Sequence, residues 1–244
     1  MAGILFLISA PSGSGKSTLV KELRSVVDNL VFSVSFTTRK PRGSEQEARE
    51  YHFISREEFQ RMIDADEFLE YADVFGNYYG TALRPITDAF AKGKDVLLDI
   101  DVQGASQVRK KMPEAVSIFL MPPSPEDLAY RLQNRSRAEL PHPTSVEAEM
   151  QQQIIQRRLA RARLEIENYR EYDYILVNDV LDRAVGEMAA IVAAARMCRN
   201  HGAKTEDDEE LIAKAEHCRQ RNSEARIKPV LQAFGVVNAE AAPV

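Results

Sequence analysis

The chain has 244 residues, of which 44% are hydrophobic and 28% charged, a composition typical of a globular protein with one large domain or a core with insertions. Its formal net charge of −5 argues against non-specific nucleic-acid binding by the whole surface. No apolar run reaches the roughly 20 residues of a membrane span, and Ile4–Ile8 is too short for a signal-peptide core. We therefore expect a cytoplasmic protein without a membrane or nucleic-acid partner.

A phosphate-binding loop is predicted near the N-terminus. The apolar run Gly3–Ile8 precedes the loop sequence, and a helical pattern follows over 17–28. In this strand, loop and helix context, backbone N–H groups surround phosphate oxygens and the helix N-terminus adds partial positive charge. The residues predicted to bind ATP in this loop are Ala10, Pro11, Ser12, Gly13, Ser14, Gly15, Lys16, Ser17 and Thr18.

Individual loop residues have distinct predicted tasks. Lys16 reaches the outer phosphates, and the Ser17 hydroxyl ligates Mg²⁺. Gly13 and Gly15 allow positive φ or close approach of the backbone to phosphate. Ala10 stands where the common pattern has its first glycine, which is harmless if that residue keeps strand-like dihedral angles.

The following segments alternate in type. Val31–Phe36 and Tyr51–Ile54 read as short strands around a polar loop at 37–50. Ser55 begins a helix, with Glu58 completing a capping box. Further strand-like pieces, at 68–74 and 77–81, precede a helix that Pro85 opens.

The second half continues the alternation and indicates an α/β fold with a mainly parallel sheet. Asp99 and Asp101 end one apolar run and are expected on one strand face, at the sheet edge where ligands bind. The remaining predicted elements are buried strands at 94–101 and 116–121, a helix at 125–137, a loop at 138–149, a helix at 150–169, a strand at 174–177 and a helix at 181–197.

A break near 200–203 precedes a C-terminal extension, 201–244, for which no role is predicted. Thr205 and Asp208 form a capping box for a helix whose apolar stripe is Leu211, Ala215 and Cys218. We expect the stripe to dock on the core or on a second subunit, and the last twenty residues to be irregular. Cys198 and Cys218 are expected as free, partly buried thiols, because their spacing with His201 and His217 matches no usual zinc motif.

Taken in order, these motifs resemble guanylate kinases over roughly residues 3–198. The motifs are the phosphate loop, Ser35-Phe-Thr-Thr-Arg-Lys-Pro-Arg-Gly43, Glu50-Tyr-His-Phe53, Glu70, Gly76-Asn-Tyr-Tyr-Gly-Thr81, Asp99-Ile-Asp-Val-Gln-Gly104 and Val177-Asn-Asp179. The resemblance implies a P-loop kinase that converts ATP and GMP to ADP and GDP with Mg²⁺. It also implies a core at 1–33 and 83–200, a GMP-binding subdomain at 34–82 and a lid at about 136–157.

The resemblance assigns the GMP site residue by residue. Arg39 and Arg42 would bind the GMP phosphate together with the hydroxyls of Tyr51 and Tyr79, and guanidinium groups match phosphate oxygens in pairs. One carboxylate can accept from both donors of guanine, and the resemblance gives this task to Glu70. The remaining assigned residues are Ser35 and Thr81 at the guanine carbonyl, with Asp99 and Asp101 at the GMP site and Asp101 also near the metal through water. The resemblance leaves the division of roles between the two aspartates open.

On the ATP side, the resemblance implies that the lid arginines Arg131, Arg135 and Arg158 close on the phosphates and stabilise charge during transfer. Asn178 would contact adenine. The prolines within 136–149 depart from the family lid, which leaves open which lid arginines are catalytic.

Two other functions remain alternatives at this stage. A guanylate-kinase-like interaction module would keep the fold without catalysis, and a related small-molecule P-loop kinase would use another acceptor. The presence of Lys16, Arg39 and Glu70 favours the enzyme. The sequence leaves the oligomeric state open, and a homo-oligomer is compatible with it.

Overall fold

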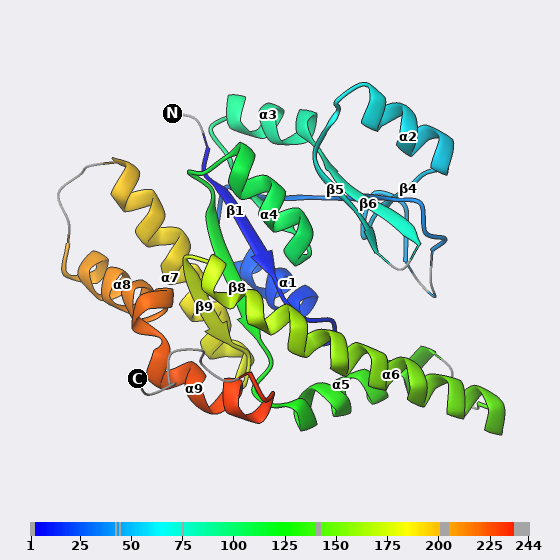
Figure 1. The fold of residues 1–244 in the computed structure, drawn as a ribbon. Coiled ribbons are helices and arrows are strands. Elements are labelled where there is room, and N and C mark those ends of the chain that lie inside the picture. Colours follow the sequence, from blue (N-terminus) through cyan, green and yellow to red (C-terminus); the bar gives the residue numbers. More distant parts are fainter. Residues whose placement is uncertain are drawn as a thin grey trace, which may run out of the picture. The chain divides into compact units, whose positions relative to one another are not determined.

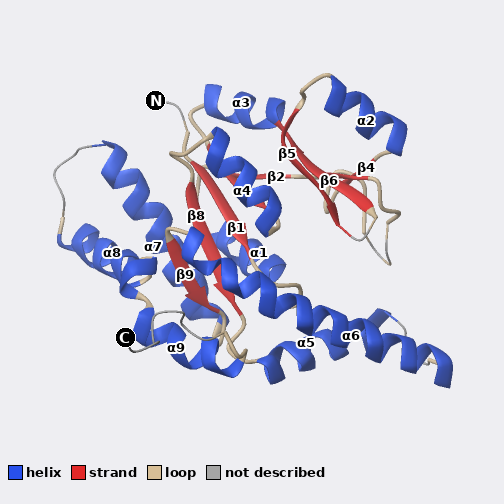
Figure 2. Cartoon of the chain, in the orientation of Figure 1, coloured by secondary structure: helices blue, strands red, loops and turns tan. Residues whose placement is uncertain are grey.

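Figures 1 and 2 show the α/β fold of the chain in a computed structural model, and this confirms the predicted fold class. The chain divides into two units, the first formed by Met1–Ser9 with Arg24–Ser117 and the second by Ala10–Leu23 with Ile118–Val244. These units do not coincide with the segments predicted from the sequence. The structure describes residues 3–41, 43, 45–74, 76–139, 143–200 and 205–236, without the side chains of Glu139 and Asn200.

Parallel strands form the core of the first unit. The central strand β7 (Asp95–Asp99) pairs with β1 (Leu5–Ser9) and with β2 (Leu30–Ser33), and Val96 lies opposite both Leu5 and Val31. Every side chain of β1 is buried, as expected for a parallel strand that is covered on both faces. The buried strand predicted within 94–101 is confirmed.

A second sheet in the first unit has the strand order β4-β3-β6-β5. The short strands β3 (Phe36–Thr37) and β4 (His52–Phe53) pair in parallel, whereas β5 (Phe68–Val74) and β6 (Asn77–Ala82) form an antiparallel hairpin. Since side chains alternate along a strand, successive residues of β6 face opposite sides of this sheet.

One face of this sheet packs against α2 (Arg56–Asp64). The Ser55 side chain caps the helix by accepting from the Glu58 N–H at 3.1 Å. Phe59 of α2 stacks on Phe68 of β5 with ring centroids 4.5 Å apart. The other side of the hairpin is left for polar residues, and α3 (Leu83–Ala91) follows it directly.

The helix α4 (Val102–Lys111) follows β7 and was not identified from the sequence. Asp101 is its N-cap and accepts from the Gly104 N–H at 2.8 Å. The prediction that Asp99 and Asp101 share one strand face is therefore wrong for Asp101, because β7 ends at Asp99. A side chain that hydrogen-bonds to N–H groups of the following turn favours helix initiation over strand continuation.

The second unit contains the parallel pair β8 (Val116–Met121) and β9 (Tyr174–Val177), in which Ile118 lies opposite Tyr174. Both strands match their predicted ranges. The helices of this unit begin with α1 (Lys16–Val26), which crosses the unit boundary, and continue with α5 (Pro125–Glu139), α6 (Ser145–Ile166), the short η1 (Glu167–Glu171) and α7 (Leu181–Asn200).

The helix α6 begins five residues earlier than predicted, so the expected loop at 138–149 is mostly wrong. Thr144 and Glu147 form a capping box, with the Thr144 N–H donating to the Glu147 carboxylate at 2.8 Å. This Thr-x-x-Glu pattern in the sequence indicates a helix start, whereas the neighbouring prolines favoured the prediction of a loop. Residues 140–142 lie outside the described part of the chain.

The extension belongs to the second unit and contains α8 (Glu206–His217), η2 (Gln220–Asn222) and α9 (Glu224–Ala233). The predicted capping box of Thr205 and Asp208 is confirmed. The helix α9 contradicts the expectation that the last twenty residues are irregular, because Ile227, Val230 and Leu231 are buried. Within the stripe, Ala215 and Cys218 are buried in the chain's own fold, so the extension docks on the core.

The extension continues the sheet at β9. The Ile175 N–H donates to the Cys218 carbonyl at 2.8 Å, and the Gln220 N–H donates to the Asp173 carbonyl at 2.9 Å. Between these bonds, the Arg219 guanidinium lies 4.3 Å from the Tyr174 ring centroid. A strand edge that would otherwise expose unpaired backbone groups is thereby covered.

A partly buried ion pair fastens α9 to α7 and β9. Arg226 Nη1 lies 3.1 Å from both carboxylate oxygens of Glu187, and Nη2 donates to the Ile175 carbonyl. Only 6% of Glu187 is exposed. A buried carboxylate needs such a partner, because desolvation of an unpaired charge is unfavourable.

Both cysteines are free thiols, as predicted, but the expected partial burial is wrong for Cys198, which is exposed, whereas Cys218 is buried. Within the described residues, no group of three or more His, Cys, Asp or Glu side chains is placed to hold a metal, and His201 lies outside that part of the chain. None of the described helices is both long and apolar enough to span a membrane.

We expect Arg226→Ala to lower the free energy of unfolding by about 3 kcal/mol, because it removes the guanidinium that compensates the charge of the buried Glu187 carboxylate. Urea unfolding followed by circular dichroism measures the change.

The control is Arg221→Ala, which removes an exposed ion pair of 3.0 Å to Glu216. Its effect should stay below about 1 kcal/mol. If the two substitutions changed stability equally, the buried pair would contribute no more than a surface pair, contrary to our expectation.

Candidate active site

The predicted phosphate loop has the backbone that its glycines suggest. Gly13 and Gly15 have φ of 95° and 88°, in the region that favours glycine. The Ser14 N–H donates to the Pro11 carbonyl at 3.1 Å, and α1 begins at Lys16. Since N–H groups at a helix N-terminus attract anions, the loop can bind phosphate through its backbone.

The neighbouring loop residues are placed as predicted. Among the described residues, positive φ at non-glycine positions occurs at Asn29, Ala48 and Asp66, so Ala10 does not need to be glycine. Lys16 is half-buried in the first turn of α1. Ser17 follows it with an exposed side chain, and a hydroxyl oxygen is the donor type that Mg²⁺ takes beside water and substrate phosphates. The residue therefore fits a magnesium ligand.

Two side chains from distant segments hold the loop at one carbonyl. Arg131 Nη1 and Asn178 Nδ2 donate to the Ser14 carbonyl at 3.0 and 2.7 Å, and Arg131 Nη2 donates to the Asn178 carbonyl at 2.8 Å. A Cβ on Gly15 would lie 2.4 Å from Asn178 Nδ2. The structure thus gives Arg131 and Asn178 a task that the sequence did not predict, which is to fix the phosphate loop.

The other two predicted lid arginines lie on two adjoining helices. Arg135 is exposed on α5, one turn beyond Arg131, and Arg158 is half-buried on α6. The helices α5 and α6 pack against each other (Figure 1). The structure therefore places both arginines in the same unit as the phosphate loop.

In the first unit, Arg39 is the centre of a polar cluster and is only 8% exposed. Its Nε donates to the Tyr79 hydroxyl at 3.1 Å, and its Nη2 contacts both Glu45 oxygens at 2.9 and 3.0 Å. Burial opposes the charge, but the bonds to Glu45 and Tyr79 raise the pKa of Arg39 above its usual value. Glu45 is a member of this cluster that was not predicted from the sequence, and Arg42 lies outside the described residues.

Tyr51 completes this cluster beside Arg39. The guanidinium lies 5.5 Å from the Tyr51 ring centroid, and the Tyr51 and Tyr79 rings meet edge to face at 5.7 Å. Burial and the nearby Asp99 charge raise the pKa of Tyr51 to about 12. The phenol keeps its proton at neutral pH and can donate a hydrogen bond to an anion.

Glu70 is the most deeply buried carboxylate among the predicted residues, with 4% exposed. It lies on β5 opposite Thr81 of β6, whose hydroxyl donates to Glu70 Oε1 at 2.5 Å. Burial, opposed by this bond and helped by the Asp101 charge, raises the pKa of Glu70 to about 7. Thr81 thus donates to the carboxylate, whereas the resemblance implies a bond to the guanine carbonyl.

The remaining predicted acceptor residues lie in the same unit. Asp99 ends β7 beside Tyr51, and Asp101 caps α4 near Glu70. Ser35 accepts from the His52 N–H through its carbonyl at 2.9 Å, and its side chain is half-buried. The described residues predicted for GMP thus all belong to the first unit, and those predicted for ATP and the lid belong to the second.

Comparisons with known proteins give one family. A family model for guanylate kinase matches residues 3–195. The chain is 50% identical to a guanylate kinase of Koribacter versatilis over 96% of this chain and 97% of that protein, and 48% identical to one of Neisseria gonorrhoeae over 81% and 91%. The structure resembles that of a guanylate kinase from Anaplasma phagocytophilum with a TM-score of 0.59 at 32% identity, covering 88% of this chain and 96% of the other. The match to the Koribacter protein covers 96% of this chain, so it includes part of the C-terminal extension.

We expect Glu70→Gln to stabilise the ligand-free protein as the pH rises. Since the Glu70 pKa of about 7 exceeds the ordinary 4.5, the folded state binds a proton that the unfolded state releases between these values. The stability gain of the variant should therefore be small near pH 5 and reach about 3 kcal/mol at pH 8. Urea unfolding at both pH values measures it.

Glu58→Gln is the control, because Arg61 lowers the pKa of the exposed Glu58 carboxyl. This substitution should give no gain at pH 8. A gain of similar size there would show that loss of any negative charge, and not relief of a buried one, stabilises the protein.

Proposed function

Because the chain belongs to the guanylate kinase family and is an enzyme that transfers a phosphoryl group from ATP to GMP, we propose that its two units divide this task. The second unit binds ATP through the phosphate loop, and the first binds GMP through the clusters around Arg39 and Glu70. The observation that carries the acceptor assignment is the buried Glu70 carboxylate, held by Thr81 at 2.5 Å.

On the donor side, the loop N–H groups and the N-terminus of α1 bind ATP phosphates, and Lys16 neutralises charge at the outer phosphates. The proposed lid, about 136–157, brings Arg135 and Arg158 to the same phosphates. Mg²⁺, when bound, offsets phosphate charge, and Ser17 is its proposed ligand, with Asp101 acting through water. Phosphoryl transfer needs positioning and charge neutralisation more than covalent participation, which suits this set of side chains.

On the acceptor side, residues 34–82 form the proposed GMP-binding segment. Arg39, Arg42, Tyr51 and Tyr79 bind the GMP phosphate. Charge-assisted bonds from a guanidinium are strong, and Tyr51 keeps its proton with a pKa of about 12. In the ligand-free state the Glu45 carboxylate bonds to Arg39. A phosphate that binds Arg39 therefore shares the guanidinium with Glu45 or displaces it.

Glu70 selects the base. Guanine presents a ring N–H and an exocyclic amino group side by side, and one ionised carboxylate accepts from both. Adenine places an acceptor at the ring position, which would leave a buried carboxylate oxygen unpaired. Ser35 and Thr81 are the proposed partners of the guanine carbonyl, and Asn178 that of adenine. Thr81 already donates its hydroxyl proton to Glu70. Donation to the guanine carbonyl therefore requires the hydroxyl to turn away from Glu70.

Two alternatives are less well supported. An interaction module without catalysis would not need an ordered phosphate loop, and here Arg131 and Asn178 anchor such a loop. A related small-molecule kinase with another acceptor would not need the buried Glu70 carboxylate opposite Thr81, which suits the two donors of guanine. We further propose that the enzyme acts on free nucleotides in the cytoplasm.

We expect GMP, and more weakly dGMP, to accept phosphate from ATP, whereas AMP should be disfavoured on the order of 10⁴-fold. ADP formation with GMP, dGMP, AMP, UMP or CMP as acceptor measures this preference. Equal rates with GMP and AMP would contradict the role of Glu70, and no ADP with any acceptor would favour the interaction module.

Lys16→Ala should lower kcat at least roughly a hundredfold, because Lys16 acts on phosphate charge. Circular dichroism checks that the variant is folded. Lys21→Ala is the matched control, since Lys21 is an exposed lysine on the same helix, and its kcat should change less than about twofold. A folded Lys16 variant with full activity would refute the proposed ATP site.

A further inference from the structure

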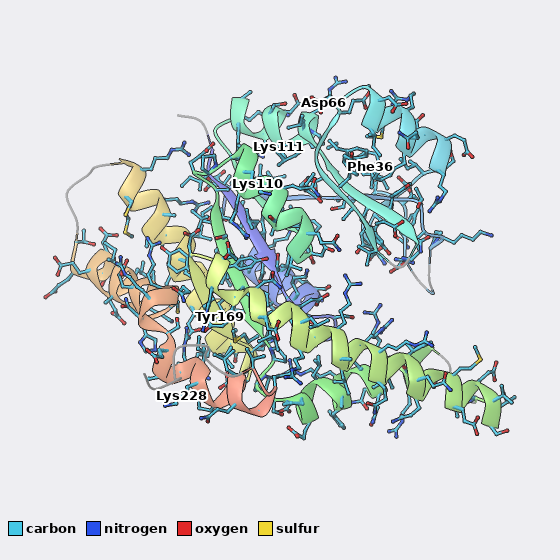
Figure 3. The ribbon with its side chains drawn as sticks, in the orientation of Figure 1. Phe36, Asp66, Lys110, Lys111, Tyr169 and Lys228 are labelled. Atoms are coloured by element: carbon cyan, nitrogen blue, oxygen red, sulfur yellow. The ribbon has the colours of Figure 1, made fainter. Side chains whose placement is uncertain are left out.

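The helix α4 presents one face to β5, the strand that carries Glu70. Gly104, Gln107 and Lys111 are spaced by three and four residues, so they lie on one side of the helix. Each of them meets β5, at Glu70, Tyr71 and Phe68 respectively. Figure 3 labels Lys111 and its neighbour Lys110 on this helix.

Two of these residues hold the β5 backbone on either side of Glu70. Gln107 Nε2 donates to the Tyr71 carbonyl at 2.7 Å, and the Tyr71 N–H donates to Gln107 Oε1 at 3.3 Å. This pair of bonds imitates the pairing of a neighbouring strand. Lys111 Nζ donates to the Phe68 carbonyl at 3.3 Å.

The third residue leaves room for the carboxylate itself. A Cβ on Gly104 would lie 2.4 Å from Glu70 Oε2 and 2.9 Å from its Cδ. Retreat of the helix is opposed, because Gln107 and Lys111 bond α4 to the β5 backbone. The other oxygen of Glu70 is held by Thr81.

The backbone gives no reason for glycine at this position. The described glycines with positive φ are Gly13, Gly15, Gly43, Gly76, Gly93 and Gly235, and Gly104 is not among them. Alanine in a helix is more favourable than glycine by about 1 kcal/mol. Space for the carboxylate therefore accounts for Gly104, and local conformation does not.

We propose that α4 is the positioning element for the base-selecting carboxylate, with Gly104 as the position where any side chain displaces Glu70 and Gln107 as the residue that fixes its strand. This inference rests on the proposed role of Glu70. Gly104 and Gln107 act through Glu70, so their loss weakens acceptor recognition and leaves the ATP side unchanged.

The test compares Gly104→Ala and Gln107→Ala with the control Lys110→Ala, which changes an exposed residue of the same helix. Steady-state kinetics give kcat and the KM for GMP and for ATP. We expect the KM for GMP to rise at least tenfold in the first variant and at least threefold in the second, with the KM for ATP within twofold. Lys110→Ala should change neither constant more than twofold.

A second measurement separates positioning of Glu70 from general damage to the unit. In a Glu70→Gln background that already binds GMP weakly, Gly104→Ala should raise the KM for GMP less than threefold, because non-additivity reveals coupled residues. Additive effects would overturn the proposal, as would unchanged GMP kinetics in folded Gly104 and Gln107 variants. If Gly104→Ala fails to fold, the Gln107 result decides. If the unsubstituted enzyme did not prefer GMP over other nucleoside monophosphates, the proposed function itself would be contradicted.

Discussion

Burial of one ionisable carboxylate constrains the first unit more than any other interaction. Glu70 is 4% exposed, and burial raises its pKa to about 7. Moving a charge out of water is unfavourable unless polar partners receive it. The hairpin supplies the Thr81 hydroxyl, α4 supplies space at Gly104, and the capping Asp101 adds a nearby negative charge that opposes ionisation.

The same burial underlies the selectivity that we propose for Glu70. A carboxylate that lacks partners on its remaining lone pairs gains most from a ligand with two adjacent donors, which guanine has. A base without them leaves that oxygen desolvated and unpaired. On this proposal, a less stable ligand-free fold accompanies discrimination between bases, as is common at functional sites.

The second unit depends on a different interaction, the anchoring of one backbone carbonyl. Ser14 lies between two glycines with positive φ, a loop that has little stability by itself. Arg131 from α5 and Asn178 after β9 converge on its carbonyl. Since β9 also bonds to Cys218 and Arg226 of the extension, the loop, the strand and the extension form one continuous network within this unit. The extension therefore belongs to the fold.

The sequence by itself determined many of the features that depend on neighbours in the chain, although the local caps at Asp101 and Thr144 were not predicted. The phosphate loop, the strands at 68–74, 116–121 and 174–177, and the Thr205 cap were all predictable, because glycine dihedral angles, apolar runs and capping side chains act over a few residues. Tertiary structure decided what long-range contacts create. It paired Thr81 with Glu70 and Arg131 with Ser14, and formed α9 from a weakly patterned segment. A hydrogen-bonding side chain in the sequence has many partners open to it, and only the packed fold selects one.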